Sequence, residues 1–146
     1  MPLSFDLLHE SDIAEIESIA SWFSEFNPSN IQKFLSEKQN IAFTAKFDGE
    51  IIGLLYGYSL TRMDNTKPQF FIYSVDIHEA HQNMGCGSKL IKYALDWAKN
   101  KGFSESYVFT HKDNPQACRA YQKAGMVHSE SDCERMYEVV YLDKNL

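Results

Sequence analysis

The sequence predicts a single α/β domain (α+β in detail) built on one mixed β-sheet. A tight turn at Asp48-Gly49 lies between two strand-like segments, so that part of the sheet is expected to be antiparallel. The second half of the chain runs strand, amphipathic helix, strand, which is typical of a parallel βαβ unit. A length of 146 residues suits one domain and no repeat or linker divides it, so the expected domain covers residues 1–146.

The first element expected is a helix that begins at Ser11-Asp12, because both residue types are common helix starts. Apolar residues follow at spacings of three and four, as one face of a helix requires; they are Ile13, Ile16, Ile19, Ala20 and Phe23. The segment Asn27-Pro28-Ser29-Asn30 interrupts this pattern. A short second helix is then expected from Ile31 to near Glu37.

Three strands are expected next. Ile41–Phe47 and Glu50–Leu60 flank the Asp48-Gly49 turn and form the predicted hairpin. A polar loop follows from Arg62 to Gln69, and Phe70–Ile77 is a strand composed mostly of aromatic and β-branched residues.

The second half predicts two helices and three strands. Apolar residues on one helical face identify the first helix, which should stop at Gly102; they are Leu90, Ile91, Ala94, Leu95 and Ala98. Glu105–Thr110 is the next strand, and Asn114-Pro115 begins a helix that ends at Ala124 before Gly125. The final strands are expected at Met126–Ser129 and Arg135–Leu142, which makes about four helices in all.

Charge and composition limit the partners. With 14 Lys and Arg against 20 Asp and Glu the net charge is −6, and no basic stripe is present, so no nucleic-acid partner is expected. An acidic surface attracts cationic small molecules, although solubility alone explains such a charge. The longest apolar runs are about half a membrane span and the amino terminus has no leader pattern, so we expect a cytoplasmic protein that does not enter a membrane.

The three cysteines indicate neither a disulfide framework nor a metal site. Cys86, Cys118 and Cys133 are odd in number and form no close pair. We therefore expect reduced thiols and no bound metal.

A short polar loop at a strand-to-helix junction is the first functional signal. It reads Gln82-Asn83-Met84-Gly85-Cys86-Gly87-Ser88. Glycines let a backbone approach a ligand closely, and the amides at a helix start point outward unpaired, so the loop suits a pyrophosphate. A Rossmann fingerprint would need glycine where Leu90 stands, and a P-loop would need Lys-Ser or Lys-Thr where Ser88-Lys89 stands.

A second motif lies about thirty residues later and reads Asn-x-x-Ala-x-x-x-Tyr-x-Lys-x-Gly-Met. Gln82, Gly85 and Gly87 with Asn114, Ala117, Tyr121 and Gly125 match the pattern R/Q-x-x-G-x-G/A followed by N-x-x-A-x-x-x-Y-x-x-x-G-F, in which Met126 replaces the usual Phe. In these residues and in its order of elements, the chain resembles the GCN5-related N-acetyltransferases (GNAT superfamily).

The resemblance implies a mostly antiparallel sheet with a central parallel strand pair that splays to bind acetyl-CoA. The strand ending Val75-Asp76-Ile77 would offer the backbone of Val75 and Ile77 to the pantetheine and the thioester. The loop from Gln82 to Ser88, Asn83, Met84 and Cys86 included, would hold the pyrophosphate. Asn114 would contact the pantetheine arm, and Ala117 and Tyr121 would also bind the cofactor.

The resemblance also implies that Tyr121 is the general acid. For the general base, Asp76 is the only acid on the strand beside the thioester, and strict alternation would put it on the face of Ser74 and Ile72, opposite Tyr73, Val75 and Ile77. The alternatives are His78, His81, His111 or a water chain. Covalent catalysis through Cys86 is not expected, although it lies at a helix amino terminus.

A narrower resemblance concerns the acceptor. Leu55–Leu60, the loop with Pro68, and Phe71–Val75 are similar to aminoglycoside 3-N-acetyltransferases, which have an aspartate where Ser74 stands here. The resemblance implies a cationic small-molecule amine, with an aminoglycoside as one candidate. The alternatives are a polyamine, an amino acid, a protein amino terminus, or a coenzyme A-binding module without catalysis. Dimers are common in the family, and Tyr137 and Tyr141 are partner-facing candidates, although core packing is the favoured interpretation.

Overall fold

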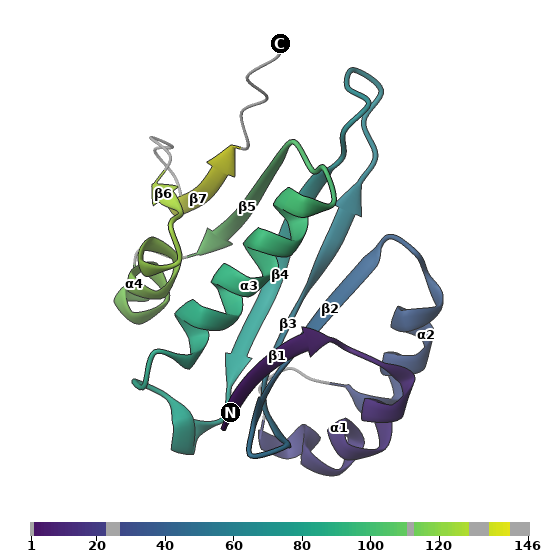
Figure 1. Ribbon diagram of the computed structural model, residues 1–146, viewed down its shortest axis with the longest axis vertical. Helices are drawn as coiled ribbons and strands as arrows, with labels where there is room; N and C mark the ends of the chain where they lie inside the picture. Colours follow the sequence, from purple (N-terminus) through teal and green to yellow (C-terminus); the bar gives the residue numbers. More distant parts are fainter. Residues whose placement is uncertain (1, 23–26, 111–112, 129–134, 141–146) are drawn as a thin grey trace.

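The computed structural model of the chain describes residues 2–22, 27–110, 113–128 and 135–140. These residues form a seven-stranded sheet in the order β1-β2-β3-β4-β5-β7-β6 (Figure 1). The strands are β1 (Leu3–Leu7), β2 (Asn40–Phe47), β3 (Glu50–Leu60), β4 (Gln69–Ile77), β5 (Glu105–Thr110), β6 (Val127–His128) and β7 (Arg135–Val140). All neighbours are antiparallel except β4 and β5, which are parallel, so the predicted mixed sheet is confirmed.

The sequence analysis missed the edge strand β1. Its residues Leu3, Phe5 and Leu7 alternate with polar residues and pack against the main core, while β1 pairs with β2 from Leu3 opposite Phe47 to Leu7 opposite Phe43. This period of two is the ordinary signal of a half-buried strand. The signal is only five residues long.

The hairpin between β2 and β3 turns at the predicted residues. Asp48 and Gly49 both have positive φ, at 49° and 85°, as a two-residue turn of the primed type requires. The twist of this turn matches that of the flanking strands, which fixes their register.

Helix α3 (Cys86–Asn100) covers one face of the sheet. Its apolar stripe packs on the large buried side chains of the strands, among them Phe43, Phe70 and Ile72. Gly102 ends the helix with a φ of 88°, and the Phe103 amide donates to the Ala98 carbonyl at 3.1 Å. Helix α4 (Pro115–Lys123) contributes Cys118 and Tyr121 to the same core, so α3 and α4 share this face.

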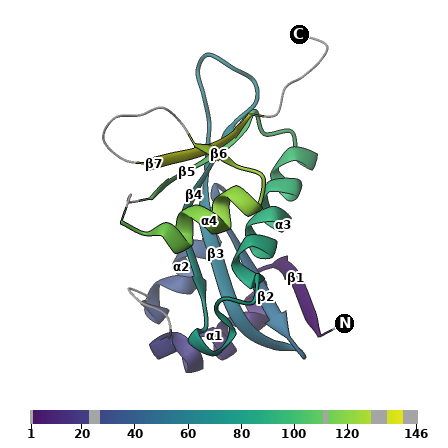
Figure 2. The same cartoon turned by 90° about the vertical axis from the view of Figure 1, so that its left-hand side faces the viewer.

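The other face carries the two short helices α1 (Ile13–Ile19) and α2 (Ile31–Ser36), and Figure 2 shows α2 and α3 on opposite sides of the sheet. Ile16 and Ile31 pack here on Ile51 and Leu54 of β3. The predicted first helix is α-helical from Ile13 to Ile19 and is flanked by one-turn 3₁₀ segments at Glu10–Asp12 and Ala20–Trp22; Phe23 lies outside the described residues.

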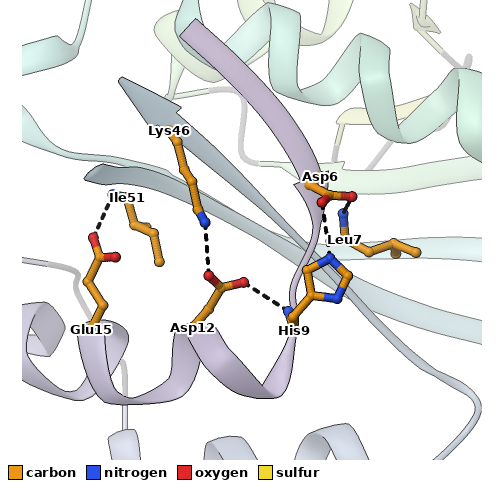
Figure 3. Close-up of polar contacts among 7 residues, drawn as sticks. All are labelled: Asp6, Leu7, His9, Asp12, Glu15, Lys46 and Ile51. Carbon is orange, nitrogen blue, oxygen red and sulfur yellow. Dashed lines mark hydrogen bonds and ion pairs between the residues drawn. The ribbon is translucent and has the colours of Figure 1, made fainter. Parts of the chain in front are cut away.

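An ion pair fixes the first helix to the sheet (Figure 3). The buried Asp12 accepts a bond from Lys46 Nζ at 3.0 Å through one carboxylate oxygen and from the His9 amide at 2.9 Å through the other. Glu15 accepts from the Ile51 amide at 2.7 Å. The carboxylates of Asp12 and Glu15 thus accept hydrogen bonds from a lysine and from two backbone amides, which connects the first helix to β2 and β3.

The carboxyl-terminal strands are shorter in the described residues than predicted. Ser129, Tyr141 and Leu142 lie outside the described residues, as does Cys133. Tyr137 is fully buried against Tyr121 and His128, so core packing is its role and it does not face a partner. A homodimer stays a prediction. Within the described residues, no helix is both long and apolar enough to cross a bilayer.

Candidate active site

The parallel strands β4 and β5 diverge near the centre of the sheet. They pair only from Gln69 opposite Glu105 to Ile72 opposite Val108, although β4 continues to Ile77 (Figure 1). Beyond Ile72 the β5-facing side of β4 therefore has backbone groups that pair with no strand among the described residues. This is the splayed parallel pair that the predicted fold includes.

A β-bulge at this point changes the faces of β4. Tyr56 lies opposite Ser74 and the next residue, Gly57, lies opposite Ile72, so Tyr73 is an extra residue on β4. Val75 and Ile77 consequently pack with Ile72 in the α3 core. Strict alternation predicted that Asp76 shares a face with Ile72 and lies opposite Tyr73, Val75 and Ile77. The part of this prediction that concerns Ile72 and Tyr73 is wrong, because both precede or form the bulge.

A cavity of about 360 Å³ fills the opening between β4, the loop before α3 and helix α4. Eleven of the residues singled out in the sequence line it, and they are Val75, Asp76, Ile77, Gln82, Asn83, Gly85, Gly87, Ser88, Asn114, Ala117 and Tyr121. The structure thus brings the two sequence motifs together, although they are thirty residues apart.

Two predicted residues do not line this cavity. The Met84 side chain is exposed, and Cys86 is buried in the core with its side chain among the residues of α3. Any role of these two residues in binding must involve their backbone groups. A buried thiol in apolar surroundings is also a poor nucleophile, which agrees with the expectation against covalent catalysis.

The loop backbone is shaped by residues with positive φ. Asn83 has φ 64° and Gly85 has φ 80°, and a side chain on Gly85 would meet no other atom within 4 Å. Glycine is therefore required there by the backbone conformation rather than by crowding. The Gln82 side-chain amide donates to the Ile77 carbonyl at 2.9 Å and connects the loop to the end of β4.

The start of α3 presents backbone donors to the cavity. The Lys89 amide already bonds to the Gly85 carbonyl at 3.1 Å, and the amides ahead of it in the first turn have no partner within the helix. Gly87 and Ser88 line the cavity at this point. With the positive end of the helix dipole, these donors suit an anionic group.

Helix α4 forms the opposite wall. Asn114 caps it by accepting from the Ala117 amide at 3.1 Å, and Pro115 occupies the first helical position. Gln116 donates to the Asn83 side chain at 3.2 Å, which joins α4 to the loop across the cavity mouth. Arg119 faces the cavity one turn further along.

Tyr121 lies at the inner end of this wall and is 7% exposed. Burial, with smaller contributions from the nearby Cys118 and Asp76, raises its pKa to about 12. The phenol is therefore protonated at neutral pH. Its ring packs 5.7 Å from that of Tyr137, which holds it in place.

The candidate bases differ in position. Asp76 lines the cavity, lies close enough to Tyr121 to affect its pKa, and is 3.4 Å from the Ser74 hydroxyl. His81 lines the cavity too, whereas the His78 ring meets the Trp22 ring edge-on at 4.3 Å. His111 lies outside the described residues.

Six cavity residues were not among the predicted catalytic and cofactor-binding residues, although His81 was an alternative base. They are His81, Ile91, Gln116, Arg119, Ala120 and Lys123. Of those on α4, Ala120 lies three residues after Ala117 and helical spacing would have found it, whereas Gln116, Arg119 and Lys123 lie one or two positions from Ala117 or Tyr121 and the motif spacing does not indicate them. Among the described residues, no group of three His, Cys, Asp or Glu is placed to hold a metal ion.

The sequence of this chain is similar to those of known acetyltransferases. A family model described as "Acetyltransferase (GNAT) family" matches residues 7–126. The sequence is 22% identical over 117 residues to "Probable N-acetyltransferase camello" of Xenopus tropicalis. That match covers 80% of this chain and 52% of the relative, so the chain spans about half the length of this curated relative.

Solved structures share the fold along nearly the whole chain. An aminoglycoside acetyltransferase from an uncultured soil metagenomic sample, in complex with sisomicin, is 24% identical with a TM-score of 0.77, covering 99% of this chain and 97% of its own. The structure of yncA from Salmonella typhimurium, with its cofactor acetyl-CoA, is 17% identical with a TM-score of 0.78, covering 99% and 96%.

Proposed function

Because the chain belongs to the acetyltransferase (GNAT) family, we propose that it is an acetyl-CoA-dependent N-acetyltransferase that acetylates a primary amine of a small molecule. One observation carries the proposal. A single cavity extends from the amino terminus of α3 to the buried phenol of Tyr121. An anion site and a proton donor at the two ends of one cavity suit a thioester that is attached to a pyrophosphate.

The residues at the cavity mouth fit acetyl-CoA. The free amides at the start of α3 suit the pyrophosphate, and Arg119 and Lys123 place two cations at the same cavity. Neither cation forms an ion pair with the described residues. The unpaired backbone edge of β4 at Val75 and Ile77 is available to an amide-bearing arm.

Acetyl-CoA would supply an acetyl group on a thioester, so that a C–N bond to the amine forms and the C–S bond breaks. The residues of the chain must then accept one proton from the amine and place one on the thiolate. We assign the first step to Asp76, directly or through water, with His81 as the alternative, since both line the cavity.

We assign the second step to Tyr121. Its pKa of about 12 exceeds the roughly 8.5 of an ordinary thiol, so the phenol is a weaker acid than the thiol that it would protonate. Tyr121 is therefore first a hydrogen-bond donor to the negative charge that develops on sulfur. Transfer of the phenol proton to the thiolate is uphill by this pKa difference, so the proton that Asp76 accepts from the amine must return to the tyrosinate for the step to balance.

Two observations support a cationic acceptor, and an aminoglycoside is one candidate. The net charge is −6, and an aminoglycoside acetyltransferase is among the structures that share the fold. The carboxylate on this strand belongs to Asp76, two residues after Ser74, the position at which the resembling aminoglycoside acetyltransferases have an aspartate. Polyamines, amino acids and protein amino termini are the other acceptors to test.

A thiol-release assay with acetyl-CoA and a panel of amines tests the proposal, with calorimetry of acetyl-CoA binding beside it. We expect turnover with at least one amine, and a loss of about a hundredfold or more in kcat for Tyr121→Phe with acetyl-CoA affinity retained. Binding without turnover on any amine would favour a coenzyme A-binding module. A wild-type protein that does not bind acetyl-CoA would refute the proposal.

A further inference from the structure

A second cavity lies on the other face of the sheet, under helix α2. It measures about 230 Å³ and is enclosed by Ile31 and Phe34 of α2 and by Leu54, Tyr56 and Tyr58 of β3, together with other apolar or neutral residues. None of the described residues that line it is charged. The function proposed above assigns no role to it.

Aromatic rings form the wall of this second cavity. Phe34 meets Tyr56 edge-on at 5.4 Å and Tyr58 at 6.0 Å, while Tyr56 and Tyr58 are nearly perpendicular at 6.4 Å. Tyr56 also stacks on Tyr73 at 5.4 Å, and Tyr73 is 58% exposed. The aromatic surface therefore continues from the cavity to the bulge in β4.

The register of β3 and β4 connects this wall to the candidate active site. Leu54 lies directly opposite Asp76, and Tyr56 lies directly opposite Ser74. Opposite residues of an antiparallel pair point to the same face, with Cα atoms about 4.5–5.5 Å apart. Since Asp76 also lines the first cavity beside Tyr121, an amine at the edge of the second cavity is one strand away from the place of transfer.

We propose that the second cavity binds the acetyl acceptor and that this acceptor is a small primary amine with an apolar body, such as an arylalkylamine. The inference rests on the proposed function. The apolar body would lie against the wall formed by Phe34, Tyr56 and Tyr58, with the amine directed toward Asp76. A single ammonium group is attracted by the faces of tyrosine rings within about 6 Å.

The size and the neutrality of the cavity argue against a polycation. Cavities for drug-sized ligands measure roughly 300–1,000 Å³, and this one is smaller. Several ammonium groups would lose their hydration against a wall that offers no carboxylate among the described residues. An amine with one charge and an apolar body loses little hydration and gains apolar contacts.

Acetylation kinetics with 2-phenylethylamine, tyramine, putrescine and gentamicin test the inference. We expect kcat/KM to be at least about tenfold higher for the two arylalkylamines than for putrescine or gentamicin. The reverse order would overturn the inference while it left the proposed function intact. If no amine is acetylated and acetyl-CoA does not bind, the proposed function itself fails.

Substitutions in the aromatic wall of the second cavity test whether its rings bind the amine. Replacement of one ring by an aliphatic side chain, Tyr58→Leu or Phe34→Leu, should lower kcat/KM for 2-phenylethylamine about fivefold or more through KM, with the KM for acetyl-CoA unchanged. Tyr58→Phe, which keeps the ring, should retain most of the affinity. Tyr93→Leu on α3, at the opposite face of the sheet, is the control and should change neither constant.

A binding measurement on the wild-type protein does not depend on whether a variant folds. Calorimetric titration of 2-phenylethylamine into the protein saturated with coenzyme A should show one site. Absence of binding, or equal KM values for the wild type and both leucine variants, would refute the inference.

Discussion

The buried phenol of Tyr121 should make the stability of the protein depend on alkaline pH. Burial raises its pKa from 10.0 to about 12, whereas the unfolded chain has the ordinary value. The unfolded state therefore ionises first, and the stability that is fully present below pH 10 is lost as the pH rises toward 12. A shift of two units corresponds to roughly 3 kcal/mol in the limit above pH 12, and to about half of that at pH 11.

Urea unfolding of the wild type and of Tyr121→Phe at pH 8 and pH 11 measures this effect. The variant removes only the hydroxyl and keeps the ring that packs 5.7 Å from Tyr137. Other groups that titrate, including Tyr58 and Tyr107, whose pKa values burial also raises, are common to both proteins. We expect the wild type to lose about 1 kcal/mol more than the variant between the two pH values.

A second measurement detects the proton itself. The difference between the phenolate absorbance titrations of the two folded proteins reports Tyr121 alone, and its midpoint should lie well above pH 10. Equal losses of stability in both proteins, together with a difference midpoint near pH 10, would show that Tyr121 ionises like a solvated phenol. The role of a neutral hydrogen-bond donor would then lose its physical basis.

Three further predictions concern the loop, the cations and the core. Gly85→Ala should lower the free energy of unfolding by about 1–2 kcal/mol and weaken acetyl-CoA binding, because φ is 80° there. Gly49→Ala, at φ 85° in the hairpin turn, is the control: urea unfolding should show a similar loss of stability, and acetyl-CoA binding should be unchanged. Joint replacement of Arg119 and Lys123 by alanine should raise the KM for acetyl-CoA about fivefold but not that for acetyl-pantetheine, which lacks the phosphates; equal effects on both would remove the cations from phosphate binding. Thr44→Val should raise the free energy of unfolding by about 1 kcal/mol, because the buried hydroxyl of Thr44 has no hydrogen-bond partner among the described residues; a destabilised variant in urea unfolding would contradict this.

The fold could be predicted largely because its signals are local. The Asp48-Gly49 turn, the apolar stripe of α3 and the glycine that ends it each need only a few neighbouring residues. The strand β1 was missed because its five-residue alternation is short. The 3₁₀ segments at the two ends of α1 were predicted as parts of one helix. A 3₁₀-helix and an α-helix both place apolar residues about three positions apart on one face, so the sequence pattern does not distinguish them.

The site could be predicted in part. The two motifs and the end of β4 together supply most of the residues that line the cavity, and the motifs meet because the chain returns α4 beside α3 after β5. The side chains of Met84 and Cys86 lie outside the cavity because residues within one loop need not share a direction. The second cavity had no signal in the sequence, since Phe34 and Tyr56 meet only through tertiary packing.

The bulge at Tyr73 decides on which face of the sheet Asp76 lies. In a regular strand the period of two would place Ser74 and Asp76 on the α3 face with Ile72, and the carboxylate would be buried in an apolar core. One extra residue reverses this assignment for the rest of β4, so that Val75 packs in the α3 core and Asp76 lies opposite Leu54 under the other face. The carboxylate thereby lies between a cavity with phosphate-binding features and a cavity with an aromatic wall. If the two proposed binding sites are correct, a sheet that splays and bulges within two residues places the candidate base Asp76 between acetyl-CoA and the amine.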